Sequence, residues 1–340
     1  MNMRLITSAC CVMLVLGACL LAAQAPQPKT PPKADPKAKV EPKKDEPKKD
    51  EPKKVEPKKE EPKKVEPKKT EKKMDKKAEP KVEPKVEVKS PFVDKSLEDV
   101  VKKVLQHSQG VLSEANLANV YVLDATGKNV VDLTGLDKCV NLAELRLSKN
   151  AVVNLAPLKD LKNLQSLHLA DNKVADVAPL AGLTKLQYLE LTNNQVASVA
   201  PLAGLTSLSA LYLSGNQIAD LAPLGGLAKL SSLSLARNKV VDLKPLEKVT
   251  RLTVLDLKEN QIADLAPLGK QTELSLLMLE KNKIADLGPL VAACKADGAG
   301  PKRFAPYLRL YLAGNPLAEA TKAAQLADLK AVGVRLEDWK

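Results

Sequence analysis

Residues 202–224 read LAGLTSLSALYLSGNQIADLAPL, and this stretch decides the fold because close copies of it follow one another along the chain. An asparagine takes the place of Asn216 in copy after copy, at a spacing of 22 residues. Such a fixed period predicts a solenoid, in which each unit is stable only because it stacks on its neighbours. The ladder asparagines are Asn150, Asn172, Asn194, Asn216, Asn238, Asn260 and Asn282, with a last one at Asn315.

Each unit carries its own secondary-structure signals. Apolar residues take the first, fourth, seventh, tenth and twelfth places, and Leu211-Tyr212-Leu213 alternates as a short strand with one buried face does. Asn216 follows where the chain leaves that strand. We expect its amide to bond backbone groups of neighbouring turns and other copies of itself. Pro223 lacks an amide hydrogen, so the returning segment is expected to form turns or short 3₁₀ pieces.

This pattern closely resembles the leucine-rich repeat family. The length of 22 residues and the N-x-[IV]-x-D-[LV]-x-P-L tail are similar to the bacterial internalin and phosphatase-regulatory types. The resemblance covers residues 114–317. It implies an α/β solenoid, a horseshoe with short parallel strands on the concave face, 3₁₀ and turn segments on the convex face, and helical caps. It also implies that the concave face binds proteins.

The repeat departs from its pattern mainly near its ends. Ala125 replaces a leucine in the first unit, Cys139 does so in the next, and Gln271 puts a polar side chain at another leucine place. Asn315 follows Asn282 by 33 residues, so about 11 residues are inserted near 291–307. Imperfect terminal units are expected where a repeat must cap the stack.

The two ends of the repeat array carry cap signals. Residues 92–113 predict an N-terminal helical cap, with a helix that opens with a capping box at 96–99 and that Gly110 ends. Residues 318–340 predict a C-terminal cap, with a helix over 321–331 that Gly333 ends.

Residues 1–25 predict a signal peptide. Arg4 precedes an apolar run from Leu5 to Leu21, which is short for a membrane span and typical of a secretory signal. Residues 16–19 read LGAC and resemble a bacterial lipobox, which would leave a lipidated Cys19 as a membrane anchor. Residues 23–25 read AQA and resemble an ordinary cleavage site, which would release a secreted protein. Both alternatives predict an extracytoplasmic protein.

Residues 26–91 form a linker rich in proline, lysine and glutamate, with 23 lysines against 15 acids. It cannot bury apolar surface, so it is predicted to be disordered and extended, and its lysines could contact anionic envelope polymers. The linker carries most of the net charge of +12, and about +3 remains for residues 92–340. With few aromatic residues as well, this balance argues against nucleic-acid binding.

No catalytic pattern stands out in the chain. The two histidines, His107 and His168, belong to no metal-binding or nucleophilic arrangement, and no phosphate-binding loop occurs. We therefore expect no enzyme, no cofactor and no metal. The recurring aspartates are interpreted as turn residues. Cys139 is expected in the core, and Cys294 is expected to be half-buried in the inserted unit.

The outward strand positions predict where a ligand binds, because the register is known. Three interpretations stay open for this concave surface: an aromatic and acidic patch, an apolar patch, and an ordinary mixed surface. The first patch comprises His168, Tyr188, Glu190 and Tyr212, and the second comprises Val254, Leu276 and Met278. Tyrosine favours the first patch, because it is enriched at protein interfaces.

Two functions fit these observations. The first is a non-catalytic protein-binding module, displayed on the cell envelope by a long tether, which holds an unidentified protein ligand on its concave sheet. The alternative is a structural envelope spacer, whose lysine- and proline-rich linker associates with anionic wall or membrane polymers. Substitutions on the concave face distinguish them, since only the first function depends on that face.

Overall fold

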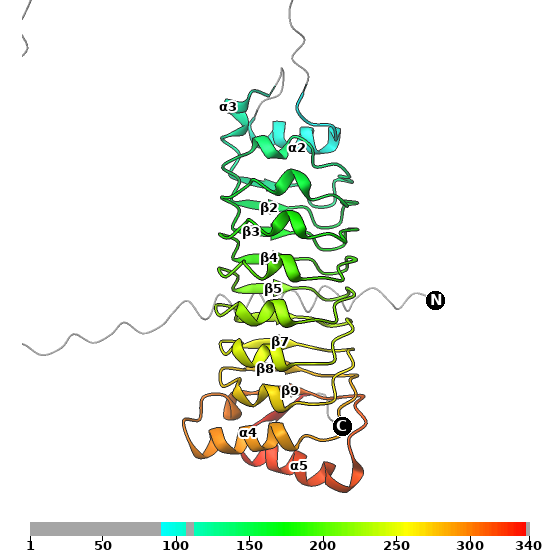
Figure 1. Ribbon diagram of the computed structural model, residues 1–340, viewed down its shortest axis with the longest axis vertical. Coiled ribbons are helices and arrows are strands. Elements are labelled where there is room, and N and C mark those ends of the chain that lie inside the picture. The colour runs from blue at the N-terminus through cyan, green and yellow to red at the C-terminus, as the bar shows by residue number, and fades with distance from the viewer. Residues whose placement is uncertain (1–89, 107–111, 338–340) are drawn as a thin grey trace, which may run out of the picture. The chain divides into compact units, whose positions relative to one another are not determined.

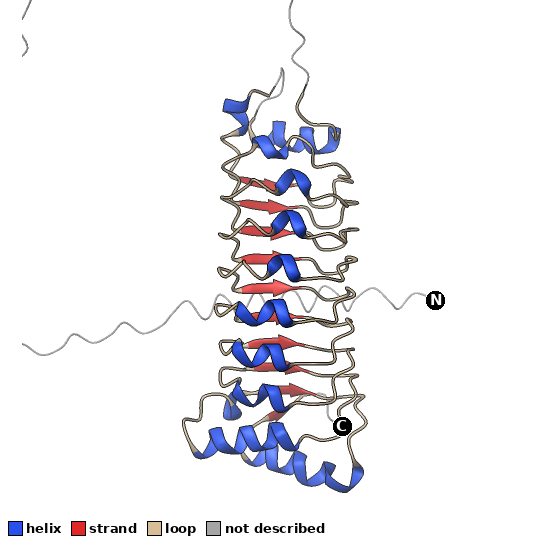
Figure 2. Ribbon diagram, in the orientation of Figure 1, coloured by secondary structure: helices blue, strands red, loops and turns tan. Residues whose placement is uncertain are grey.

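A computed structural model describes residues 90–106 and 112–337 of the chain. The signal segment with Cys19, the linker up to residue 89, His107 and Gly110 lie outside the described residues. The described residues of the repeat form a stack of similar rungs (Figure 1). Strands run along one side of the stack and short helical segments along the other, as Figure 2 shows.

The strand side of the stack is one parallel sheet, in which each strand pairs with the next along the chain. Partners such as Leu189 and Leu211 stand one repeat apart, so the repeat period is also the sheet register. The predicted leucine-rich repeat solenoid is therefore confirmed. The strands of the described residues are β1 (Val122–Asp124), β2 (Glu144–Arg146), β3 (Ser166–His168), β4 (Tyr188–Glu190), β5 (Ala210–Tyr212), β6 (Ser232–Ser234), β7 (Val254–Asp256), β8 (Leu276–Met278), β9 (Arg309–Tyr311) and β10 (Arg335–Leu336).

The opposite side of most rungs is a short 3₁₀ helix with proline in its first turn. An aspartate two residues before the helix orients this turn, since Asp220 Oδ1 accepts the N–H of Ala222 at 2.8 Å. The aspartates at 176, 242, 264 and 286 accept the equivalent bond, so the recurring acids shape the turns. These helices are η1 (Leu136–Lys138), η2 (Ala156–Leu158), η3 (Ala178–Leu180), η4 (Ala200–Leu202), η5 (Ala222–Gly226), η6 (Lys244–Lys248), η7 (Ala266–Lys270) and η8 (Ala305–Tyr307).

The core runs between these two sides and consists mainly of leucine. The repeat leucines are fully buried, as are the replacements Ala125 and Cys139. Each buried leucine contributes about 1.5–3 kcal/mol relative to an exposed one. Gln271 is also fully buried, and its Nε2 donates to the carbonyl of Leu246 at 2.7 Å. Its Oε1 has no hydrogen-bond partner in the described part of the chain.

The ladder asparagines bond the backbone of two rungs at once. Asn194 Nδ2 donates to the carbonyls of Leu169 and Leu191 at 2.8 and 3.0 Å, while its Oδ1 accepts the N–H of Val174 at 2.9 Å. The other ladder members repeat these contacts. None of the hydrogen bonds found among the described residues joins the side-chain amides of two ladder asparagines. The expectation that stacked amides bond one another is therefore wrong, because backbone groups already satisfy the donors and the acceptor of each side-chain amide.

The turn before each ladder asparagine requires a left-handed backbone. Asn193 has φ +54°, Arg237 +56° and Glu259 +54°, and Gly215 occupies the same place with φ +70°. Glycine adopts this conformation freely, whereas other residues do so at a cost of roughly 1–2 kcal/mol. Most rungs accept this strain because the bonds of the following asparagine hold the turn.

The N-terminal end is covered by helices α2 (Lys95–Val104) and α3 (Glu114–Leu117). The predicted capping box at 96–99 is wrong, because Asp94 is the N-cap of α2 and accepts the N–H of Leu97 at 3.1 Å. The second oxygen of Asp94 accepts the N–H of Val131 at 2.8 Å, which ties the helix to the first rung. Burial opposes ionisation of this carboxylate, but its backbone hydrogen bonds outweigh burial and lower its pKa.

The inserted residues form helix α4 (Gly288–Ala299), which takes the place of a 3₁₀ helix. Cys294 points from α4 into the core and is fully buried, so the expectation of a half-buried thiol is wrong. Burial raises the pKa of this thiol to about 12. After η8 and β9 the chain forms helix α5 (Glu319–Ala331), and β10 then pairs with β9.

Candidate functional site

The exposed face of the sheet is built from the first and third residues of each strand. The middle residue, such as Leu189 or Leu211, is fully buried, because successive side chains of a strand point to opposite faces. Parallel pairing in register then brings outward residues of neighbouring rungs side by side, as it does for His168 and Glu190 and for Glu190 and Tyr212. The sequence therefore determines which side chains meet on this face.

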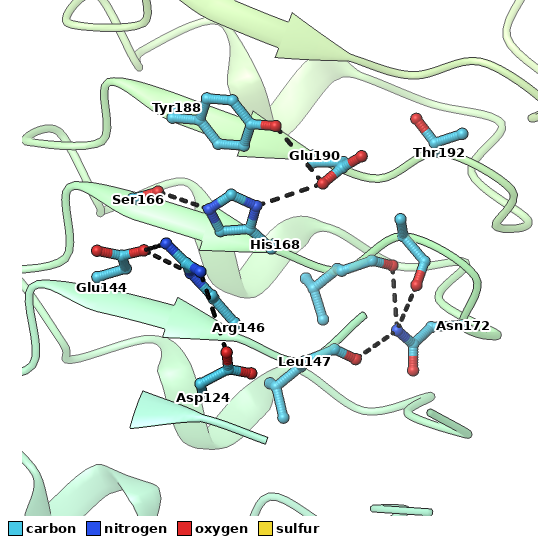
Figure 3. Close-up of polar contacts among 12 residues, drawn as sticks. Asp124, Glu144, Arg146, Leu147, Ser166, His168, Asn172, Tyr188, Glu190 and Thr192 are labelled. Carbon is cyan, nitrogen blue, oxygen red and sulfur yellow. Dashed lines mark hydrogen bonds and ion pairs between the residues drawn. The ribbon is translucent and has the colours of Figure 1, made fainter. Parts of the chain in front are cut away.

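The four residues of the aromatic patch, His168, Tyr188, Glu190 and Tyr212, lie in contact on β3, β4 and β5. The ring of Tyr188 lies between two others and is tilted to both, with centroid distances of 4.5 Å to His168 and 5.4 Å to Tyr212. Glu190 Oε2 lies 3.3 Å from His168 Nδ1 and accepts a hydrogen bond from the Tyr188 hydroxyl at 3.5 Å (Figure 3). All four side chains are half-buried.

Hydrogen bonds among its own side chains fix the geometry of the aromatic patch. His168 Nε2 lies 3.0 Å from Ser166 Oγ, so both ring nitrogens have partners on this face. Burial, with the negative charge of Glu190 as a second cause, raises the pKa of Tyr188 well above its usual value of 10.0. This hydroxyl therefore stays protonated and serves as a hydrogen-bond donor. Such a preorganised surface loses little side-chain freedom when it binds.

Charged side chains continue the face toward β1. Arg146 donates from Nε to Glu144 Oε1 at 2.6 Å, and its Nη1 lies 4.0 Å from Asp124 Oδ2 (Figure 3). Asp124, Glu144 and Glu190 give this end of the sheet three carboxylates, and Arg146 gives it one guanidinium. The N-terminal half of the face is therefore acidic.

Small hydroxyl residues separate the two patches. Tyr212 Oη lies 3.2 Å from Ser232 Oγ, and Ser234 Oγ donates to Asp256 Oδ2 at 3.1 Å. Burial raises the pKa of Asp256, although Lys258 opposes the shift. These contacts make the middle of the face a low, polar surface between larger side chains.

The apolar patch, Val254, Leu276 and Met278, lies on β7 and β8. Val254 pairs with Leu276 in register, and Met278 pairs with Asp256. All three apolar side chains are half-buried. The structure thus brings the members of each predicted patch together and separates the patches by β6.

One regular feature of the rungs escaped the sequence interpretation. The hydroxyls of Ser231, Thr253 and Ser275, just before the strands, donate to backbone carbonyls of the preceding rung at 3.1, 3.0 and 3.0 Å. Their 22-residue spacing is visible in the sequence, but it is a weaker signal than that of the leucines and asparagines.

Neither a metal site nor a membrane span is found in the described ranges. Within residues 90–106 and 112–337, no group of three His, Cys, Asp or Glu side chains is placed to hold a metal ion. No helix there is long and apolar enough to cross a membrane.

Comparison with known proteins identifies the repeat. The family model of Leucine Rich repeats (2 copies) matches residues 140–182, 162–204 and 206–248. No curated protein matches the chain. Among solved structures, the ectodomain of the plant membrane receptor kinase GASSHO1/SCHENGEN3 from Arabidopsis thaliana is similar in fold alone. It shares 22% identity, with a TM-score of 0.53 and coverage of 66% of this chain and 28% of that chain.

A bacterial structure is more similar in sequence. Internalin C2 from Listeria monocytogenes str. 4b F2365 shares 37% identity with this chain, with a TM-score of 0.58. The match covers 59% of this chain and 89% of that chain. This identity over most of the length of internalin C2, together with the repeat matches, shows that the chain belongs to the internalin-like leucine-rich repeat proteins of bacteria.

Proposed function

We propose that this protein is a non-catalytic protein-binding module that holds its ligand on the exposed face of the sheet. The observation that carries the proposal is the aromatic patch. Tyr188 and Tyr212 are large, amphipathic side chains that the core does not require, and they lie half-exposed on the outer face of the sheet. Aromatic anchors of this kind contribute much of the affinity at protein interfaces.

The charge of this face favours a basic contact from the partner. Glu190 Oε1 accepts no hydrogen bond from the described residues, and Asp124 and Glu144 add negative charge beside it. An arginine or lysine of the partner would pair with Glu190 and lie against the ring of Tyr212. The apolar patch, two to three rungs away, would then contact an apolar part of the same partner.

The setting of the module is also part of the proposal. The signal-like residues 1–25 and the linker 26–91 support display on the cell envelope, through a lipid on Cys19 or as a secreted protein. The competing role is an envelope spacer, in which the linker contacts anionic polymers and the exposed face of the sheet has no ligand.

Capture from an envelope extract tests the proposal. The full chain serves as bait beside the double variant Tyr188→Ala/Tyr212→Ala. The matched control is Tyr121→Ala/Tyr307→Ala, since both tyrosines are exposed and lie outside the aromatic patch. We expect a protein that the parent and the control retain and the patch variant loses. Equal retention by all three chains, or no retained protein, would reject the aromatic patch as the binding site and favour the spacer.

A further inference from the structure

A second candidate site lies on the edge of the solenoid where the chain enters strands β5 to β8. A groove of about 980 Å³ opens there, away from the residues of the exposed sheet face. We call it the flank groove. Its lining residues all end in polar or charged groups: Ser209, Lys229, Ser231, Thr250, Arg251, Thr253, Lys270, Thr272, Glu273 and Arg303.

Positive charge dominates the flank groove, with four cationic side chains against one carboxylate. Lys229 and Arg251 are exposed and contact no acid among the described residues. Lys270 is paired with Glu247 at 2.9 Å, outside the lining. The two unpaired cations stand on neighbouring rungs, so their charges reinforce each other inside a concave surface that concentrates the field.

The insertion that interrupts the repeat builds one end of this groove. Asp297 at the end of α4 accepts the N–H groups of Arg303, Phe304 and Ala305 at 3.0, 3.1 and 3.0 Å. These bonds fix the segment that brings Arg303 to the flank. There its Nη2 donates to Thr272 Oγ1 at 3.0 Å, and its Nη1 lies 3.5 Å from Glu273. Arg303 thus closes the groove beyond the rung of Thr272 and Glu273.

The hydroxyls of the groove can act both as hydrogen-bond donors and as hydrogen-bond acceptors toward a ligand. Thr272 Oγ1 accepts from Arg303, so its own proton remains available to an anionic oxygen. Ser231 and Thr253 donate to the backbone carbonyls of the preceding rung, so their oxygens remain available as acceptors. A ligand that carries negative groups and hydroxyls would satisfy both sets.

We propose that the flank groove binds an acidic polysaccharide. Lys229, Arg251 and Arg303 would pair with its carboxylate or sulfate groups, and the serine and threonine hydroxyls would bond its sugar hydroxyls. A protein partner fits less well, because the groove has no aromatic or aliphatic anchor of the kind that protein interfaces use. This site is separate from the exposed face of the sheet, so polysaccharide binding here does not depend on the proposed protein ligand.

Site-resolved lysine acetylation in the full chain tests the proposal despite the lysine-rich linker. Acetylation is followed by mass spectrometry at physiological ionic strength, with and without a heparin-derived hexasaccharide. We expect several-fold protection of Lys229 and Lys270. Lys173 and Lys239 are exposed on the opposite edge, after the ladder asparagines, and should react at unchanged rates. Equal rates at Lys229 with and without the hexasaccharide, or equal protection of Lys173, would overturn the proposal.

Matched variants and ligands make the test specific. Arg251→Gln should raise the hexasaccharide concentration that half-protects Lys229 about tenfold, as expected for one lost charged hydrogen bond. Arg237→Gln is the control, because Arg237 lies on the opposite edge and bonds only the exposed Asn193 among the described residues. Equal protection by neutral dextran would show that charge is not the basis of binding. Equal or stronger protection by polyglutamate would assign the groove to an acidic peptide, and either result would overturn the proposal.

Discussion

Replacing the ladder residue Asn194 by alanine is expected to destabilise the solenoid strongly. The change removes both donors and the acceptor of one buried amide. It leaves the carbonyls of Leu169 and Leu191 without that donor and the N–H of Val174 without that acceptor. Each buried backbone group left unpaired costs about 1–3 kcal/mol. Because neighbouring water can reach part of the turn, we expect a total loss of about 4 kcal/mol in the free energy of unfolding.

The neighbouring residue supplies a matched control. Asn193→Ala changes the same side chain one position earlier, where the amide is exposed and contacts Asp171 and Arg237 at 2.6 and 2.9 Å. Its main cost is the left-handed backbone of Asn193, for which alanine is less suited, and this amounts to roughly 1 kcal/mol. The two variants should therefore differ by about 3 kcal/mol in the free energy of unfolding.

Urea unfolding followed by far-UV circular dichroism measures this difference. Each rung packs mainly against its neighbours, so a change in the m-value would show that the damaged rung divides the array into separately unfolding parts. Equal losses for Asn193→Ala and Asn194→Ala would refute the view that the buried amides hold the turns. So would a loss of only about 1 kcal/mol for Asn194→Ala.

Three further experiments concern Gln271, Cys294 and Asp297. Gln271→Leu should raise the free energy of unfolding by about 1 kcal/mol, because it removes an unpaired buried oxygen. The Leu246 carbonyl still accepts a hydrogen bond from the N–H of Val249. A lower melting temperature of the variant would contradict this. Cys294 should resist iodoacetamide at mildly alkaline pH until urea is added, since burial raises its pKa to about 12; rapid native labelling would count against its burial. Asp297→Asn should cost about 2 kcal/mol at neutral pH, from weakened bonds to a charged acceptor. Burial opposes ionisation of Asp297, but the three backbone N–H groups outweigh burial and lower the pKa of this carboxyl group. The contribution of Asp297 to the free energy of unfolding is therefore complete above the usual pKa of 3.8, and it disappears as pH falls through the lower pKa of the folded state. The stability difference between parent and Asp297→Asn should therefore shrink in acid, and a difference that does not change with pH would disprove the assignment.

The regular part of the fold could be predicted because one period controls everything in it. From Asn150 to Asn282, the place of each leucine and each ladder asparagine follows from the 22-residue spacing. The same register correctly placed His168 next to Glu190 and Val254 next to Leu276 on the exposed face. The contacts between the rings and the sharing of the Glu190 carboxylate depend on side-chain rotamers, which the register does not determine.

The ends and the insertion could not be predicted in the same way. The N-cap of α2 is Asp94 because its other oxygen reaches Val131, a partner 37 residues away that no local capping pattern reveals. The inserted residues form α4 and then bring Arg303 to the flank through the bonds of Asp297. The flank groove depends on that placement, so lysine and arginine positions in the sequence alone do not indicate it.

Binding at the aromatic patch can be measured as the affinity of a captured protein for the exposed face of the sheet. The dissociation constant would be measured for the parent chain, for Tyr188→Ala/Tyr212→Ala and for Tyr121→Ala/Tyr307→Ala. Loss of two aromatic anchors at an interface should weaken binding by about 30-fold or more, whereas the control tyrosines should leave it unchanged. Similar constants for all three chains would contradict the claim that this protein holds its ligand at the aromatic patch.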